Sequence, residues 1–275
     1  MIRESKLYKF LRYIFLFCSV LFVIIPVVPL VYMAFKTGAE YSATGVLTPP
    51  KNWLNFYNFK YAIRVGNLGK ALLTSAEIIA ISLAIQVMFT TMVAYVLNRF
   101  DFIGKKIVKT LFTLTMFIPV VTTQTVVFKI IYSMGLVNHI LSVIILYSGV
   151  TIVGIYIMLN LLVSIPRDLD EAALIDGANY FTIYGKIIFP LLKPACTTLI
   201  ILNGISMYND FYIPNLYLQK DVTTFTVALY DFFGNTATPF EIVSAAILLG
   251  VIPIAIVYIL LQKYIFYGLS GAIKS

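Results

Sequence analysis

The most regular feature of the chain is the alternation of long apolar stretches with short polar connections. A hydrocarbon core of about 30 Å is crossed by a helix of about 20 apolar residues. Six stretches meet this requirement approximately, at 13–35, 71–97, 110–132, 140–163, 187–212 and 241–264. The pattern predicts an all-α integral membrane protein in which residues 1–275 form a single domain with six transmembrane helices.

Composition agrees with a membrane protein and excludes other classes. Hydrophobic residues make up 60% of the 275 residues and charged residues 12%, whereas about a quarter of a soluble domain is charged. The net charge of +8 does not indicate nucleic acid, because Lys and Arg lie in short clusters that flank the apolar stretches. We therefore expect contact with membrane lipid and no nucleic acid.

The basic clusters predict how the spans are oriented. One cluster precedes the first apolar stretch and another follows the second, and the positive-inside rule places both in the cytoplasm. Six spans then leave both termini in the cytoplasm. The bias is incomplete, since seven of the 20 basic residues fall on the outer side: Lys36, Lys51, Lys60, Arg64, Lys70, Lys129 and Lys220.

The polar connection after the fourth apolar stretch, at 164–186, is the most acidic part of the chain. Four of the 12 carboxylates lie within nine residues: Asp168, Asp170, Glu171 and Asp176. Acidic side chains suit the amino-terminal end of a helix, Pro166 suits its first turn, and Gly177 suits its end. Asn179 is a good cap for a second helix that begins near Tyr180. We expect a helix of about three turns, a tight glycine turn and a second short helix.

One face of the first helix in this connection has the composition of a docking surface. Leu169, Ala172, Ala173 and Asp176 follow the spacing i, i+3, i+4, i+7 and share that face. The alanine side chains leave room for another chain to approach closely. The alternative is an amphipathic helix that lies at the membrane surface, or a hairpin that caps the bundle, without a partner.

The spacing of residues in this connection resembles a known motif. Glu171, Ala172 and Ala173 are followed after three residues by Gly177 and after nine more by Ile187, with Phe189 and Pro190 close behind. This arrangement resembles the EAA motif of permease subunits of ATP-binding-cassette (ABC) importers, with Phe189 where that family usually has Leu. Further stretches resemble the carbohydrate-uptake branch: TSAEIIAISLAIQVMFTTMVAYVLNRFDFIGKK with its Ala-Tyr and Arg-Phe exit, FIPVVTTQTVVFKIIYSMGLVNHILSVIILY, NGISMYNDFYIPNLYL with Tyr208 where Trp is common, and QKYIFYGLSGAIKS.

The resemblance implies a function and a set of partners. Residues 164–186 would be a cytoplasmic coupling loop in a type I permease fold, with Glu171, Ala172, Ala173, Asp176 and Gly177 docking a separate ATPase. The partners would be a second homologous permease subunit, two ATPase subunits and an extracytoplasmic solute-binding protein, in a prokaryotic plasma (inner) membrane. The substrate would be a sugar or oligosaccharide. ATP and magnesium would be bound by the ATPase, and this chain would carry no cofactor.

The chain lacks the sequence features of an enzyme. The Gly66–Lys70 run, GNLGK, is too short for a P-loop. One His and two Cys residues cannot form a zinc cluster, and His139 falls in a predicted outer turn. Cys18 and Cys196 lie in predicted spans, where we interpret them as free packing residues. We therefore predict a transport subunit without catalytic or metal-binding residues.

Polar side chains in two predicted spans are candidates for a substrate pathway. Neutral sugars require hydrogen-bonding groups and aromatic faces. The third and fifth spans supply Thr122, Thr123, Gln124, Asn203, Tyr208 and Asn209. The alternative is that these groups bond one helix to another. Glu77 and Lys129 lie near the outer ends of spans, where extension toward the surface explains them better than a proton relay.

Two other functions remain open at this point. The outer basic residues would suit an anionic saccharide, and an importer for another solute, such as glycerol phosphate or a polyamine, is a further alternative. An ATP-independent secondary transporter or channel would require inverted repeats, unwound helices at mid-membrane or a charged relay, and the sequence contains none that we recognise.

Overall fold

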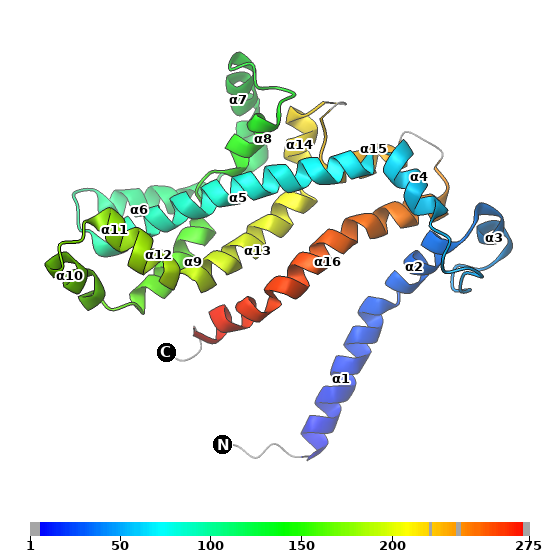
Figure 1. Ribbon diagram of the computed structural model, residues 1–275, viewed down its shortest axis with the longest axis horizontal. Coiled ribbons are helices and arrows are strands. Elements are labelled where there is room, and N and C mark those ends of the chain that lie inside the picture. The colour runs from blue at the N-terminus through cyan, green and yellow to red at the C-terminus, as the bar shows by residue number, and fades with distance from the viewer. Residues whose placement is uncertain (1–5, 220–221, 235–237, 272–275) are drawn as a thin grey trace. The chain divides into compact units, whose positions relative to one another are not determined.

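The computed structural model describes residues 6–219, 222–234 and 238–271, and these residues form helices and connections without a strand (Figure 1). They divide into two compact units, one made of Met1–Lys70 and Ala228–Pro253, the other of Ala71–Val227 and Ile254–Ser275. Three basic residues of the orientation argument, Arg3, Lys220 and Lys274, lie outside the described residues, as does the end of the tail at 272–275.

The first unit begins with an apolar helix that proline interrupts. α1 (Lys6–Ile24) and α2 (Val27–Phe35) are separated at Pro26, whose ring removes a backbone donor. Together they are long and apolar enough to cross a membrane. The side chains of residues 7–24 are exposed, as expected for a helix in lipid, and they include Cys18. The expected first span is thus present as two consecutive helices.

Aromatic rings and one amide hold the connection that follows. α3 (Gly38–Ala43) is capped by Thr37, and α4 (Tyr57–Val65) follows it. Phe35 packs against Trp53, with ring centroids 5.7 Å apart. The buried Asn58 amide donates to the carbonyls of Ala34 at 2.9 Å and Lys36 at 2.8 Å. These two bonds satisfy carbonyls left free where α2 ends.

The second unit is built along α5 (Leu68–Arg99), a helix of 32 residues. Its apolar positions join those of α9 (Ile152–Val163) and α13 (Lys193–Asn209) in a buried cluster that includes Tyr95, Met158 and Leu199. The other face of α5 carries buried polar residues at Ser75, Ser82, Gln86 and Thr90. That spacing follows the helix period, so α5 presents a polar stripe to the interior of the unit.

The remaining helices vary in length. Those of the second unit are α6 (Lys105–Leu114), η1 (Thr115–Phe117), α7 (Val120–Ser133), α8 (Ile140–Tyr147), α10 (Asp168–Ile175), α11 (Tyr180–Ile183), η2 (Tyr184–Ile188), α12 (Phe189–Leu191) and α14 (Tyr212–Tyr217). Two further helices each have residues in both units, α15 (Phe225–Gly234) and α16 (Phe240–Gly271).

The structure divides three of the six expected spans. Within the described residues, three helical stretches are long and apolar enough to cross a membrane, and the number rises to six if each of three more strongly bent pairs counts as one span. The expected third span bends by 103° between η1 and α7, and the expected fourth by 44° between α8 and α9. The expected fifth bends by 71° at Leu192, and its helical backbone already begins at Tyr180 rather than at 187.

Each bend has a local cause in the sequence. Pro119 stands before α7 in an extended conformation, with ψ of 129°, because its ring and missing N–H oppose a continuous helix. Gly149 lies between α8 and α9, where glycine weakens a helix. Pro194 is the second residue of α13, two residues after Leu192. The apolar pattern predicts the apolar stretches, and the proline and glycine residues within them explain why they bend.

Two isolated charges expected near span ends are exposed. Glu77 on α5 and Lys129 on α7 both reach the surface of the chain. His139 is also exposed and caps α8, where its Nδ1 accepts a bond from the Leu141 N–H at 3.2 Å. Cys196 is buried in the α5, α9 and α13 cluster and forms no disulfide.

Candidate docking loop and cavity

The acidic connection at 164–186, which we call the acidic loop, folds as a helix, a turn and a second helix. α10 comprises eight residues from Asp168, about two turns rather than the three expected, and Pro166 precedes it instead of forming its first turn. Gly177 ends it with φ of 83°, a left-handed conformation that glycine adopts without strain. Asn179 then caps α11 as predicted, since its Oδ1 accepts from the Thr182 N–H at 2.8 Å.

The two sides of α10 differ in exposure. Asp170 and Ala173 are buried against the rest of the unit. Glu171, Ala172 and Asp176 are exposed, and Ile175 is exposed to 87%. The predicted face is therefore divided, because Ala173 packs inside the chain while Ala172 and Asp176 face outward. An exposed isoleucine between carboxylates is a surface with the mixed chemistry of a docking site.

A buried ion pair holds α10 to the end of α5. Arg99 Nε lies 3.0 Å from Asp170 Oδ2, with the two side chains 7% and 11% exposed. The nitrogen and oxygen form no aligned hydrogen bond with each other, so the contact is one of charge. Tyr95 donates its hydroxyl to Asp170 Oδ1 at 3.1 Å. The carboxylate thus has a cation on one oxygen and a hydroxyl donor on the other, as a buried charge requires.

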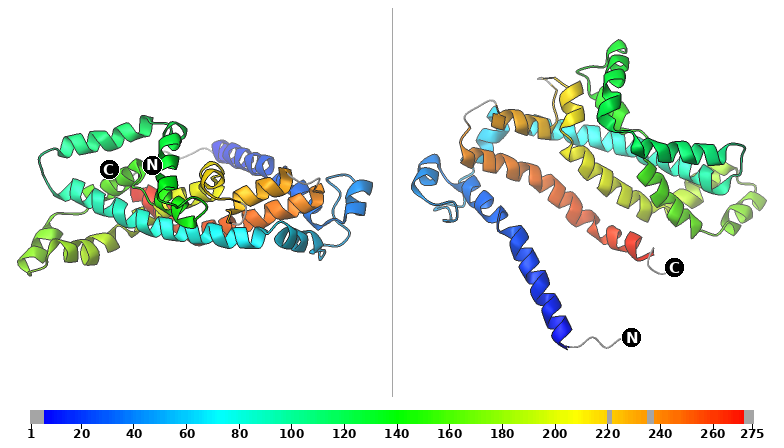
Figure 2. Two further views of the ribbon diagram at one scale, coloured as in Figure 1. Left: turned by 90° about the horizontal axis from the view of Figure 1, so that it is seen from above. Right: turned by 180° about the vertical axis from the view of Figure 1, so that it is seen from behind.

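Two hydrogen bonds from arginine side chains to backbone carbonyls also attach the acidic loop to α5. Arg99 donates through Nη2 to the Ile165 carbonyl at 3.1 Å, and Arg167 donates to the Asn98 carbonyl at 3.0 Å. The acidic loop is therefore tied to the end of α5 by the ion pair and by two bonds of the residues just before α10 (Figure 2).

Sequence reasoning missed this ion pair, although a signal for it was present. Tyr95 and Arg99 belong to the Ala-Tyr and Arg-Phe exit of the second span that resembles the importer family. They lie four residues apart and so on one face of α5. Asp170 was assigned only to the helix dipole. Nearby, Lys105 lies 2.7 Å from Asp101 and holds the pKa of that exposed carboxyl below its usual value.

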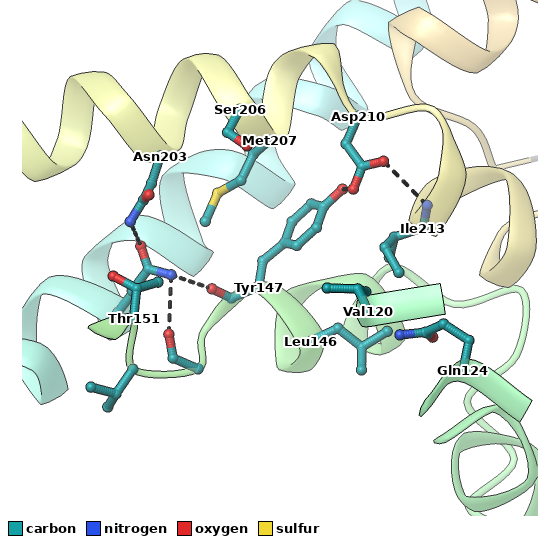
Figure 3. Close-up of a pocket in the computed structure, with 13 residues that line it drawn as sticks. Val120, Gln124, Leu146, Tyr147, Thr151, Asn203, Ser206, Met207, Asp210 and Ile213 are labelled. Carbon is teal, nitrogen blue, oxygen red and sulfur yellow. Dashed lines mark hydrogen bonds between the residues drawn. The ribbon is translucent and has the colours of Figure 1, made fainter. Parts of the chain in front are cut away.

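A cavity of about 430 Å³ lies elsewhere in the second unit, beside α5 (Figure 3). Its volume falls within the range of roughly 300–1,000 Å³ that is usual for small-molecule sites. The polar residues that line it are Gln86, Gln124, Tyr147, Thr151, Asn203, Ser206 and Asp210.

Three interruptions of helices meet at this cavity. Val120 follows the break before α7, Gly149 lies in the break between α8 and α9, and Asp210 lies between α13 and α14. Irregular backbone at membrane depth is tolerated where it is buried in protein or lines a cavity. The three breaks therefore mark the cavity as a built feature of the unit.

Gln86 stabilises one of these breaks. Its Nε2 donates to the carbonyls of Tyr147 at 2.8 Å and Gly149 at 3.1 Å, while its Oε1 accepts from Asn203 Nδ2 at 2.6 Å (Figure 3). The Tyr147 carbonyl lies at the end of α8 and the Gly149 carbonyl in the break that follows, and both would otherwise lack a helical partner. One side chain of α5 thus joins the α8–α9 break to α13.

A carboxylate and a phenol occupy the other end of the cavity. Tyr147 donates its hydroxyl to Asp210 Oδ2 at 2.8 Å, and the backbone N–H groups of Tyr212 and Ile213 donate to Oδ1 at 2.8 and 3.3 Å. Asp210 therefore has donors for both oxygens without a cation. Figure 3 shows the Tyr147 ring reaching across the cavity from α8 to this carboxylate.

The structure brings two of the six predicted pathway residues to the cavity. Gln124 and Asn203 line it. Thr122 and Thr123 bond back to the carbonyls of Pro119 and Val120. Tyr208 stacks on Phe225, and Asn209 donates to the Ile205 carbonyl. Among the residues that the structure describes, no group of three His, Cys, Asp or Glu side chains could hold a metal ion.

Comparisons with known proteins agree with the features above. The family described as "Binding-protein-dependent transport system inner membrane component" matches residues 86–270. The melibiose/raffinose/stachyose import permease protein MelC of Bacillus subtilis is 32% identical, and the match covers 91% of each chain. The multiple sugar-binding transport system permease protein MsmG of Streptococcus mutans is 33% identical over 99% of each chain.

A solved structure has the same fold. It is a chain of a bacterial ABC transporter involved in the import of the acidic polysaccharide alginate, with a TM-score of 0.84 and 21% sequence identity, and the match covers 96% of this chain and 99% of that one. At this identity the likeness concerns the fold, which is that of an ABC transporter membrane subunit.

Proposed function

The chain belongs to the family of binding-protein-dependent transport system inner membrane components, and from this we propose that it is a permease subunit of an ABC importer for a sugar or oligosaccharide. Relatives named for melibiose, raffinose and stachyose, for multiple sugars and for starch degradation products, at 31–33% identity, support the carbohydrate substrate. In this role the chain forms half of a translocation pathway and carries out no chemical reaction itself.

The observation that carries the proposal is the exposed face of α10 together with its buried attachment to α5. Glu171, Ala172 and Asp176 face outward and would dock an ATPase subunit, with the conformation of Gly177 setting the turn that follows. Ala173 would act from the inner side of α10, since a larger side chain there would displace the helix. When the two ATPase subunits close, α10 would move with them as a rigid body.

The attachment to α5 would transmit that movement to the membrane helices. The Arg99–Asp170 pair and the bonds beside it connect α10 to one end of a 32-residue helix. α5 also holds the cavity through Gln86. Rotation of α5 and its neighbours would change which side of the membrane the pathway opens to, which is the gating role that domain closure has in many proteins.

We propose six spans in a single transmembrane domain, with each bent helix pair counted as one span. Both termini and the acidic loop then lie in the cytoplasm, in a prokaryotic plasma (inner) membrane. The partners are a second homologous permease subunit, two ATPase subunits and an extracytoplasmic solute-binding protein. ATP and magnesium are bound by the ATPase, and the substrate passes polar residues that include Gln124 and Asn203.

Purification of the tagged chain from membranes of its own host tests this function. We expect a P-loop ATPase and a second homologous membrane protein to co-purify in stoichiometric amounts. The complex in proteoliposomes should take up a sugar only with ATP and the solute-binding protein. Full uptake activity by a preparation free of any ATPase would reject the importer and favour a secondary transporter.

A further inference from the structure

The cavity beside α5 presents both hydrogen-bond donors and acceptors that no other described residue occupies. The Gln124 amide accepts from the Tyr217 hydroxyl at 2.7 Å through Oε1, which leaves its NH₂ group available. Asn203 donates to Gln86, which leaves its carbonyl oxygen available. A sugar hydroxyl both donates and accepts, so a lining of mixed groups suits several hydroxyls of one ring better than it suits a purely apolar solute.

One of the residues that line the cavity is charged, and its charge is negative. Asp210 is the one carboxylate among the lining residues, and these residues include no Lys, Arg or His. Its oxygens are held by Tyr147 and by two backbone N–H groups, so the carboxylate needs no cation for its hydrogen bonds. An anionic solute that entered would meet a like charge at short range without a compensating cation, which is costly in a partly desolvated site.

The cavity lies beside α5, the helix that we propose to move with the acidic loop. Three helix interruptions line it, and Gln86 of α5 bonds to one of them. In transporters, broken helices at mid-membrane commonly surround the solute site. A solute held there would contact the same helix whose end is tied to the acidic loop.

We propose that this cavity binds one unit of a neutral, polyhydroxylated solute during transport, and that Asp210, positioned by Tyr147, excludes anionic saccharides such as uronates. The inference rests on the proposed importer function. A site of this kind argues against the anionic saccharide with which the outer basic residues were compatible. It also gives this subunit a part in selecting the substrate that is separate from the solute-binding protein.

Direct binding to the membrane complex tests the proposal. The complex of this chain with its membrane partner and ATPases is placed in lipid nanodiscs without the solute-binding protein. Binding of two neutral trisaccharides, raffinose and maltotriose, is compared by calorimetry at millimolar concentrations with binding of trigalacturonate. We expect at least one neutral probe to bind about tenfold or more tightly than the anionic one.

Two variants assign the effect to the cavity. Asp210→Asn keeps an oxygen for the N–H groups of Tyr212 and Ile213 but removes the charge, so trigalacturonate binding should rise about tenfold toward that of the neutral probes. Ser206→Leu fills the cavity and should abolish binding of all three. Asp231→Asn, the same chemical change at an exposed residue of α15 that does not line the cavity, should match the wild type.

The outcomes separate this inference from the importer function. Failure of both neutral probes to bind the wild-type complex, equal affinities for neutral and anionic probes, or unchanged binding in Ser206→Leu would overturn the cavity assignment. ATP-dependent uptake of a sugar by the same complex with its solute-binding protein would leave the importer function intact in each of those cases. Absence of that uptake, together with absence of an ATPase from the complex, would instead reject the importer.

Discussion

Arg99, the last residue of α5, forms a buried ion pair with Asp170, in the first turn of α10, at a distance of 3.0 Å. The pair joins residues that are distant in sequence, and Tyr95 donates to the same carboxylate. Its burial makes the two charges interdependent, because either one left alone would be an uncompensated charge inside the protein. The exposed face of α10 is thereby held in a fixed orientation relative to the long helix.

Loss of one member of this pair should loosen α10. We expect Asp170→Leu to lower the free energy of unfolding of the second unit by about 3 kcal/mol, because Arg99 remains buried without its partner. The exchanged variant, Arg99→Asp with Asp170→Arg, should recover part of that loss. Thermal unfolding of the complex in nanodiscs measures the loss and its recovery. The amount of ATP hydrolysed per sugar transported is a second readout.

Asp101, whose side chain is 82% exposed in its pair with Lys105, provides the control for charge removal. Asp101→Ala should leave unfolding and coupling unchanged, since ion pairs of exposed groups contribute little to stability. Equal effects of Asp170→Leu and Asp101→Ala would contradict the role that we assign to the buried pair.

Replacing Gly177 by a residue with a side chain should destabilise the protein, and the same replacement at Gly185 should not. With φ of 83° at Gly177, Gly177→Ala costs about 1–2 kcal/mol, and Gly177→Asn costs less because asparagine tolerates this conformation. Gly185 lacks a positive φ and has no atom within 4 Å of an added Cβ, so Gly185→Ala should be tolerated. Uptake and thermal unfolding of the two alanine variants compare the positions directly, and equal losses at both would show that the conformation of Gly177 is unimportant.

Gln86 should stabilise the break between α8 and α9. Gln86→Leu leaves the carbonyls of Tyr147 and Gly149 and the amide of Asn203 without this partner. Each unpaired group costs about 1–3 kcal/mol when dry, and access of water to the cavity reduces the total, so we expect a loss of about 2 kcal/mol. Gln262→Leu is the matched control because Gln262 donates only to its own helix. Similar unfolding temperatures for both variants would refute the prediction.

Glu171 should matter for coupling and not for insertion. Glu171 is exposed on α10, so Glu171→Lys removes no internal contact but reverses the charge offered to the ATPase. We expect uptake to fall at least about tenfold while the complex still inserts and ATP hydrolysis no longer responds to the solute-binding protein. Lys106→Glu, an exposed reversal on α6, serves as the control. Normal uptake in Glu171→Lys would count against the docking role.

Much of the fold was accessible from the sequence because apolar length is a strong signal. The stretches near 71–97 and 241–264 correspond to long helices, and Gly177 and Asn179 predicted the turn in the acidic loop. The bends were less accessible, because proline and glycine in a membrane span permit a bend without fixing its angle. The 103° angle before α7 depends on packing that no local pattern records.

The candidate site was predictable only in part for a similar reason. Exposure of Glu171 follows from its place on a polar helix, whereas burial of Asp170 depends on Arg99, which is 71 residues away. Likewise, Gln124 and Asn203 were identified by their chemistry, but Asp210 and Tyr147 become a site only when α8 and α13 meet at the cavity. Long-range pairings of this kind require the tertiary structure.

The central claim is that the acidic loop docks a separate ATPase in the cytoplasm. It is tested most directly by cross-linking from position 171 in a chain whose own cysteines are replaced, with Cys18→Ser and Cys196→Ala. Glu171→Cys should react with a maleimide only from the cytoplasmic side, and a bifunctional thiol reagent should join it to the ATPase subunit of the purified importer. Labelling from outside the cell, or an ATPase that never cross-links to this position in an active complex, would contradict the account.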